Sequence, residues 1–262
     1  MRLEIISEKP ASTPRPVPLL FVHGMGLAAW CWSEHFLPYF SRHGYEAHAL
    51  SLRGHGGSQR CDDMRWLSLK DYLADVEEAV SHLGRPPVLV GHSMGGRVVQ
   101  EYLERQRPAA AVLMASVPPT GLFGATWRIF RRQPVDAIKG SLMMNMKPIV
   151  ETPHKFRELV FSSDVPDEVV SSCYARLNED SYRVYLEMLV PNLKKKEPAD
   201  IPMLVLGAGK DMIMSEKDVH KTGRRYGVAA EIFPDMPHGM MLEDGCLKVA
   251  DRIINWLDSH GI

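Results

Sequence analysis

Residues 88–100, with the sequence VLVGHSMGGRVVQ, place a single serine where an apolar run meets the start of a helical pattern. Ser93 is the centre of a G-x-S-x-G pentapeptide, with Gly91 before it and Gly95 after it. In a tight strand-to-helix turn a side chain at either flank would collide with the neighbouring chain, so both positions favour glycine. Such a turn holds the serine hydroxyl over the carboxyl end of a sheet, where open α/β sheets bind ligands. A hydroxyl in this position is suited to nucleophilic chemistry, for which it needs a base such as imidazole.

The elements that would position this serine follow an alternating pattern. Short apolar runs bounded by Pro or Gly predict buried strands, and the longer segments between them have helical periodicity. We expect strands at 18–24, 46–52, 87–93, 109–119, 201–211 and 229–234, and helices at 28–44, 68–84, 94–106, 215–226 and 245–260. Only residues 2–8 offer a strand before these, so we expect a short N-terminal sheet edge.

The helix at 68–84 has the clearest boundaries. Ser68 is a suitable N-terminal cap, and Gly84 is a suitable C-terminal stop. Between them the apolar residues fall on one face, which predicts that the helix packs against the sheet. That face comprises Leu69, Tyr72, Leu73, Val76, Ala79, Val80 and Leu83.

The alternation breaks from Pro118 to about Asp200, where helix-like segments rich in Met and aromatic residues replace the strands. Strand and helix alternation predicts an α/β fold: a mostly parallel, doubly wound sheet with helices on both faces. The break predicts an inserted helical cap. We therefore divide the chain into a core, 1–117 and 199–262, and a cap, 118–198, whose Lys194–Lys196 we expect to form a solvated exit linker.

Composition excludes several classes of function. The 262 residues carry a formal net charge of −1 with scattered basic residues, which gives no electrostatic basis for binding nucleic acid. No apolar run is long enough to cross a bilayer, so we expect no integral membrane segment. The N-terminal residues do not resemble a secretory signal, and the expected location is the cytoplasm.

The four cysteines are Cys31, Cys61, Cys173 and Cys246. They lie far apart, without CxxC or Cys/His ligand spacing, so we expect buried free thiols rather than disulfides or a zinc site. We expect no cofactor and no metal.

Four segments together resemble the α/β-hydrolase superfamily. They are FVHGMG at 21–26, LRGHGGS at 52–58, VGHSMGG at 90–96, and the pair LGAGKD and MPHGMMLED at 206–211 and 236–244. The resemblance covers nearly the whole chain and implies the α/β-hydrolase fold with a Ser-Asp-His triad. In the family's chain order, nucleophile, acid, histidine, it implies that Ser93 is the nucleophile, Asp211 the acid and His238 the base.

Other roles and other residues have to be weighed against this triad. Asp211 follows a predicted strand and could instead cap the helix after it, as Asp residues commonly do. Asp235, three residues before His238, is a rival acid, although from the same short loop it cannot easily reach that ring. Among the other histidines, the resemblance implies structural or loop-ordering roles for His23, His55 and His92.

An oxyanion hole would complete the site, because attack on a carbonyl places negative charge on its oxygen. The amide of Met94, directly after the nucleophile and at a helix N-terminus, is the first expected donor. By resemblance to the family's His-Gly loop, the second donor would be the amide of Met25. We interpret LRGHGGS as structural, with Arg53 pairing with a carboxylate to hold its loop near the site.

The cap segment GLFGATWRIFRRQ alternates aromatic and apolar residues with arginines. Such a cap could roof the site and line it with apolar groups that suit an acyl chain or an aromatic group. Two alternatives are that these side chains only pack the cap onto the sheet, or that the Trp and Arg cluster acts at a membrane surface.

The sequence therefore predicts a carboxylesterase- or lipase-like serine hydrolase that cleaves esters, or thioesters, of small to medium apolar acyl groups through an acyl-enzyme. The expected partner is a small-molecule ester or thioester. A slow-turnover ligand-binding or signalling protein on the same fold, a perhydrolase and a carbon-carbon bond hydrolase are the alternatives.

Overall fold

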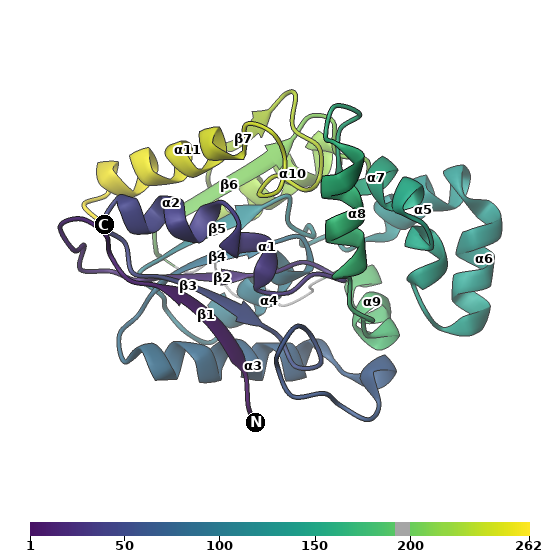
Figure 1. The fold of residues 1–262 in the computed structure, drawn as a ribbon, viewed down its shortest axis with the longest axis horizontal. Helices are drawn as coiled ribbons and strands as arrows, with labels where there is room; N and C mark the ends of the chain where they lie inside the picture. The colour runs from purple at the N-terminus through teal and green to yellow at the C-terminus, as the bar shows by residue number, and fades with distance from the viewer. Residues whose placement is uncertain (192–199) are drawn as a thin grey trace.

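A seven-stranded sheet forms the centre of the molecule, in a computed structural model that describes residues 1–191 and 200–262 (Figure 1). The strand order is β1-β3-β2-β4-β5-β6-β7, in which β1 is antiparallel to β3 and all other neighbours are parallel. The strands are β1 (Glu4–Glu8), β2 (Leu19–Val22), β3 (Ala47–Ser51), β4 (Val88–His92), β5 (Ala110–Met114), β6 (Met203–Ala208) and β7 (Ala230–Phe233). The predicted mostly parallel α/β fold is confirmed.

Helices cover both faces of the sheet, as the uninterrupted apolar strands predict. Every residue of β2 to β6 is buried. One face packs against α1 (Trp30–Ser33), α2 (Phe36–Arg42) and α11 (Cys246–Ser259). The other face packs against α3 (Leu69–Leu83), α4 (Met94–Leu103) and α10 (Glu216–Tyr226) (Figure 1).

Helix α3 begins and ends as predicted. The Ser68 side chain accepts a hydrogen bond from the Asp71 amide, and the Asp71 carboxylate accepts one from the Ser68 amide, which forms a capping box. Gly84 follows the helix with φ 65°. Most of the predicted stripe is fully buried, whereas Val80 and Leu83 at the end of the helix are half-buried.

The expected single helix at 28–44 is instead two helices, α1 and α2, separated at Glu34 and His35. Pro38 explains the break, because a proline ring clashes with the carbonyl four residues before it and supplies no amide hydrogen. Proline is tolerated in the first turn of a helix, and a new helix that starts at Phe36 places Pro38 there.

The described residues between β5 and β6 form helices and no strand. They are α5 (Phe123–Arg132), α6 (Pro134–Met143), the 3-10 helix η2 (Lys147–Val150), α7 (Pro153–Val160), α8 (Asp167–Ala175) and α9 (Tyr182–Leu189). We call this segment, Phe123–Leu189, the helical insertion, and it lies to one side of the sheet (Figure 1). The predicted cap boundary at 198 and the linker at Lys194–Lys196 lie outside the described residues.

Candidate active site

Ser93 occupies a strained corner between β4 and α4. Its backbone has φ 51° and ψ −116°, a region that non-glycine residues rarely adopt. A Cβ at Gly91 would lie 2.7 Å from the Gly95 carbonyl oxygen, and a Cβ at Gly95 would lie 2.3 Å from the Val22 carbonyl oxygen. Both flanking positions therefore exclude any side chain, and the corner presents the serine at the carboxyl end of β4.

Asp211 follows β6 and is held in one orientation by the backbone after it. Its Oδ1 accepts hydrogen bonds from the amides of Ile213 at 2.7 Å and Met214 at 2.8 Å. The next helix, α10, is capped by Ser215 instead, so Asp211 does not serve as its cap. The second carboxylate oxygen remains for another partner.

That partner is His238, in the loop between β7 and α11. Its Nδ1 donates to Asp211 Oδ2 at 2.7 Å, and the Asp211 side chain is fully buried. A carboxylate at Nδ1 fixes the tautomer and leaves Nε2 as the basic nitrogen.

His92, next to Ser93 in the chain, holds the backbone of His238. Its Nε2 donates to the His238 carbonyl oxygen at 2.9 Å, and the centroids of the two rings are 4.7 Å apart. Burial lowers the pKa of His92 well below its usual value, and the nearby His238 adds to this effect. A neutral His92 therefore links the loop of His238 to the corner of Ser93.

The rival acid Asp235 lies apart from this set. Its exposed side chain pairs with Lys210 at 3.1 Å. The structure thus brings Asp211, and not Asp235, to the ring of His238.

The predicted oxyanion donors belong to two separate loops. Met94 is the first residue of α4, where amides lack partners within the helix and the helix dipole favours negative charge. Met25 lies in the turn after β2, and Leu27 donates its amide hydrogen to the Gly24 carbonyl oxygen across that turn at 3.3 Å.

The helical insertion supplies residues that hold this second loop and that sequence reasoning missed. The backbone amide of Gly26 donates to the Asp180 carboxylate. The backbone amide of Asn178 donates to the Gly26 carbonyl oxygen at 2.8 Å. Asp180 Oδ2 also lies 3.4 Å from Nε2 of the fully buried His55. Asp180 and Asn178 stand in no recognisable motif, so no sequence signal pointed to them.

The pKa shifts of Asp180 and His55 both favour the charged forms of these side chains. Burial alone would raise the pKa of Asp180, but His55 and the Gly26 amide hold it below its usual value. Burial alone would lower the pKa of His55, but the Asp180 carboxylate raises it. Asp180 from the insertion and His55 from the LRGHGGS loop therefore favour each other's charged form beside the turn of Met25.

The neutral ring of His23 makes two hydrogen bonds, one of which connects the end of β2 to the residue that follows β3. Its Nε2 accepts a hydrogen bond from the Leu52 amide at 3.1 Å, and its Nδ1 donates to the Gly24 carbonyl oxygen at 2.8 Å. Burial, together with the nearby His55, lowers the pKa of His23 to about 3. The structure therefore agrees with loop-ordering roles for His23, His55 and His92.

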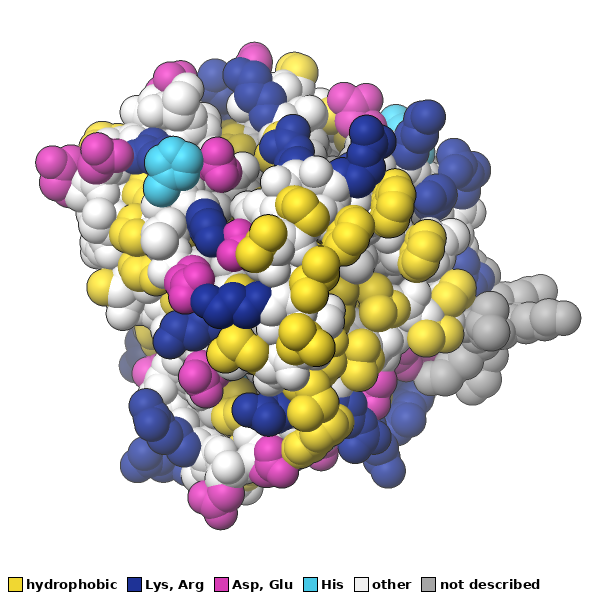
Figure 2. Space-filling view, turned by 90° about the vertical axis from the view of Figure 1, so that its right-hand side faces the viewer, with side chains coloured by type: hydrophobic (Ala, Val, Ile, Leu, Met, Phe, Trp, Pro, Cys, Tyr) yellow, Lys and Arg dark blue, Asp and Glu magenta, His cyan; other side chains and the backbone are white. Residues whose placement is uncertain are grey.

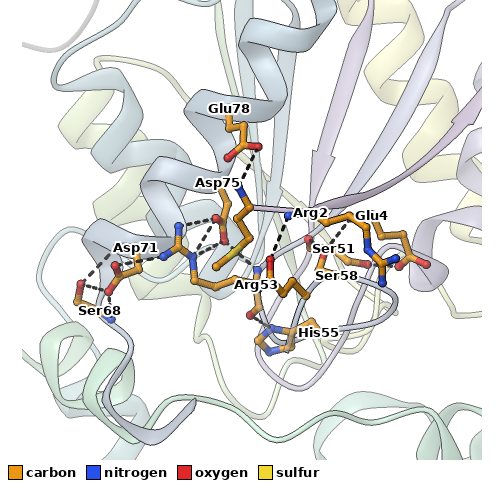
Figure 3. Close-up of polar contacts among 12 residues, drawn as sticks. Arg2, Glu4, Ser51, Arg53, His55, Ser58, Ser68, Asp71, Asp75 and Glu78 are labelled. Carbon is orange, nitrogen blue, oxygen red and sulfur yellow. Dashed lines mark hydrogen bonds and ion pairs between the residues drawn. The ribbon is translucent and has the colours of Figure 1, made fainter. Parts of the chain in front are cut away.

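Arg53 pairs with a carboxylate, as predicted (Figure 3). Its Nη2 lies 2.7 Å from Oδ1 of the fully buried Asp75 on α3, and its amide donates to Asp75 Oδ2 at 2.8 Å. A second bridge of 3.3 Å joins it to Asp71. These contacts hold the LRGHGGS loop against α3 and so position His55 (Figure 3).

The predicted triad is closed to solvent, since Ser93 is 8 % exposed and His238 4 % exposed. A cavity of about 890 Å³ lies beside the oxyanion loop, between residues 60–66 and 177–180. It is not lined by Ser93 or His238. This cavity is therefore separate from Ser93 and His238, which are both buried.

The described residues were also compared with the requirements of a metal site and of a membrane span. Among the described residues there is no group of three His, Cys, Asp or Glu side chains arranged to hold a metal ion. Within residues 1–191 and 200–262, no helix combines the length and apolar character needed to span a bilayer.

With this geometry established, comparison with known proteins identifies the family. The model of the alpha/beta hydrolase family matches residues 19–252, so the chain belongs to this family. A hydrolase with esterase-like relatives is the coarse functional class that this membership supports.

Two curated relatives show the range of named activities. Over 107 residues the chain is 38 % identical to a non-heme chloroperoxidase of Streptomyces lividans, a match covering 39 % of this chain and 38 % of that protein. Over 106 residues it is 34 % identical to Esterase PIR7B of Oryza sativa subsp. japonica, covering 38 % of each. The matches span about two fifths to one half of the length of the first curated relatives, the chloroperoxidase and a probable esterase, PIR7A, of Oryza sativa.

Solved structures share the fold over nearly the whole chain. A thermophilic esterase from Thermogutta terrifontis superposes with a TM-score of 0.72 at 20 % identity, covering 98 % of this chain and 93 % of that one. A bromoperoxidase from Bacillus anthracis gives a TM-score of 0.72 at 17 % identity, covering 98 % and 96 %. At these identities the likeness establishes the fold alone.

Proposed function

We propose that the protein is a serine hydrolase that cleaves carboxylic esters, or thioesters, of small to medium apolar acyl groups through an acyl-enzyme. The observation that carries the proposal is the 2.7 Å hydrogen bond between His238 and Asp211, in a loop tied by His92 to the strained corner of Ser93.

The chemistry follows from the roles these groups can take. His238 Nε2 removes the Ser93 proton as Oγ attacks the substrate carbonyl carbon, and Asp211 stabilises the imidazolium that forms. The imidazolium then gives its proton to the leaving group, which departs as an alcohol or a thiol. Water repeats the sequence on the acyl-enzyme, releases the acid and restores Ser93.

The amides of Met94 and Met25 would stabilise the oxyanion in both steps. Losing one such donor typically costs about 3 to 4 kcal/mol of barrier, so the rate depends strongly on the position of the Met25 turn. In this proposal Asp180 is a positioning residue, because it acts through the Gly26 amide next to Met25.

We propose that the helical insertion is the cap of this site, and that its apolar residues favour an acyl chain. Phe156, Leu159 and Val160 of α7 belong to the same hydrophobic cluster as Met240 and Met241, which follow His238. The Gly239 amide donates to the Val160 carbonyl oxygen at 2.8 Å. The cap therefore rests directly on the histidine loop and would shift to admit substrate.

A second candidate uses the same acyl-enzyme with a different acceptor. Similarity to a protein named non-heme chloroperoxidase favours perhydrolysis as this alternative. Hydrogen peroxide would then replace water, and the products would be a peracid and free Ser93. A slow-turnover ligand-binding protein and a carbon-carbon bond hydrolase stay as further alternatives from the sequence.

We place the proposed enzyme in the cytoplasm, acting on a small-molecule substrate without nucleic acid. The four cysteines support this location, because all four are free thiols, which a reducing compartment maintains. Three are buried as expected, whereas Cys61 is only half-buried.

Steady-state hydrolysis of p-nitrophenyl esters with short, medium and long acyl chains tests the proposal. We expect turnover on at least one chain length that increases with pH across the range in which an imidazole base deprotonates. The Ser93→Ala variant should lose about four orders of magnitude or more in kcat. Activity that survives this substitution would contradict the proposal, and stoichiometric release without turnover would favour the binding protein.

A further inference from the structure

Helices α5 and α6 of the insertion expose large apolar side chains on a face that none of the described residues covers. Leu142 is 80 % exposed, Val135 75 % and Phe123 73 %. We call the following set the apolar patch: Phe123, Trp127, Val135, Ile138, Leu142 and Met143. Figure 2 shows a band of hydrophobic side chains on this side of the molecule, with Lys and Arg along its edges.

The patch is not the solvent side of an ordinary surface helix, which would be polar. Ala125 is the only buried residue of α5, and Gly140 is the only buried residue of α6. The rings of Trp127 and Phe130 stack with centroids 5.6 Å apart and 15° between their planes. Several large apolar groups gathered on one exposed face indicate an interaction surface.

The charges around the patch are basic. Residues 118–150 contain five basic side chains and one acidic side chain, although the whole chain has a net charge of −1. The single acidic residue, Asp136, pairs with Lys155 at 2.8 Å. Arg131, Arg132 and Lys147 are exposed. Arg128 pairs with Asp218 and Lys139 pairs with Glu151, two acidic residues outside this range. The exposed positive charge beside the patch is therefore that of Arg131, Arg132 and Lys147.

This combination decides between two kinds of occupant. Two copies of the chain that met through the patch would bring like charges together, which disfavours a symmetric dimer. An anionic lipid surface complements both features, because its headgroups attract basic side chains while aromatic and aliphatic groups enter the boundary with the acyl chains.

We propose that α5 and α6 dock the protein on the surface of an anionic phospholipid bilayer, with the apolar patch inserted and Arg131 and Arg132 at the headgroups. The docking concerns the outer face of the insertion and does not depend on the proposed hydrolase activity. It would bring the insertion, which we propose as the cap of the site, to a surface where acyl esters are concentrated.

Vesicle co-sedimentation with the Ser93→Ala protein tests the docking without lipid hydrolysis. We expect binding to vesicles of equal parts phosphatidylcholine and phosphatidylglycerol, little binding to phosphatidylcholine alone, and weaker binding at high salt. Trp127→Ser with Leu142→Ser should lower the partition coefficient about tenfold or more, and so should Arg131→Glu with Arg132→Glu.

Matched controls separate the patch from general surface effects. Leu247→Ser with Lys248→Glu changes an exposed apolar and an exposed basic residue on α11, outside the insertion, and should leave binding within about twofold of the parent. Tryptophan emission should shift to shorter wavelength on vesicle binding. In Trp127→Phe the shift should largely disappear while binding persists, which would place Trp127 in the bilayer.

Three results would overturn the proposal. The first is no binding to anionic vesicles, and the second is an equal loss in the α11 control. The third is a dimer in solution that Leu142→Ser dissociates, because a second copy would then occupy the patch. Ester hydrolysis is measured separately on soluble substrates, so failure of docking and failure of the hydrolase proposal are distinguishable.

Discussion

At the scale of single residues, close packing and backbone hydrogen bonds fix the positions of Ser93 and Asp211. The corner cannot accept a side chain at Gly91 or Gly95, and Asp211 is fixed by two backbone amides. Ser93 and its order relative to Asp211 and His238 could be predicted because the motifs are local and ordered along the chain. The sequence also favoured Asp211 over Asp235, because a residue three positions before His238 cannot easily reach that ring. In the structure the ring of His238 contacts Asp211, and Asp235 pairs with Lys210.

Asp211→Asn tests this choice. An amide in place of the carboxylate favours the wrong tautomer of His238 and leaves the imidazolium without compensation, so kcat should fall about 10⁴-fold with a small change in KM. Asp235→Asn is the matched control and should stay within about twofold of the parent. The assignment of the acid would be wrong if the two variants exchanged these behaviours in steady-state kinetics.

At the scale of elements, most strands and long helices lie where the sequence predicts them. Strands buried on both faces appear as apolar runs in the sequence, and the ends of helices such as α3 are marked by capping residues. The expected single helix at 28–44 was wrong, because Pro38 cannot stand in the interior of a helix and instead lies in the first turn of α2. The contacts of the insertion could not be predicted, because Asp180 and Val160 reach loops more than a hundred and about eighty residues away in sequence.

The insertion contacts three loops of the candidate site, those of Met25, His238 and Asp211. Asp180 holds the oxyanion loop, and Val160 contacts the histidine loop. Arg128 of α5 donates to the Ile213 carbonyl oxygen and pairs with Asp218 at 2.9 Å, next to the loop of Asp211. Movement of the insertion would therefore affect the loops of Asp211 and His238 and the turn of Met25 together.

Asp180→Asn separates positioning from simple support of the fold. The amide can still accept from Gly26, but the charge that pairs with His55 is gone, so the Met25 turn should lose its fixed position. Because the oxyanion contact strengthens only in the transition state, we expect kcat to fall about tenfold or more while KM changes less than about threefold. Glu179→Gln, an exposed neighbour, is the control, and equal kinetics for both variants would refute the role of Asp180.

At the scale of the whole molecule, buried histidines link folding to pH. His23, with its pKa lowered from 6.5 to about 3, is neutral when folded and binds a proton when unfolded. Its contribution to stability is therefore present above about pH 6.5 and is lost as the pH falls toward 3. His92 acts in the same direction. His55, whose pKa is raised, contributes below its unfolded value and loses this contribution as the pH rises through its folded value.

Stability should therefore decrease below about pH 6.5. Each histidine whose pKa is lowered by folding, such as His23, decreases the free energy of unfolding by up to about 1.4 kcal/mol for each pH unit of acidification. Urea unfolding at a series of pH values measures this slope, and His23→Gln should reduce it relative to the parent. His220→Gln, an exposed histidine on α10, should leave the slope unchanged. An unaltered slope in His23→Gln would contradict the pKa shift.

The most direct test of the central claim is the intact mass of the protein after brief treatment with a fluorophosphonate, which forms a stable bond with an activated serine. We predict a single adduct on Ser93, no adduct in Ser93→Ala, and labelling at least about a hundredfold slower in His238→Gln. Labelling of another residue, or equal rates in the parent and His238→Gln, would show that Ser93 and His238 do not form one catalytic unit.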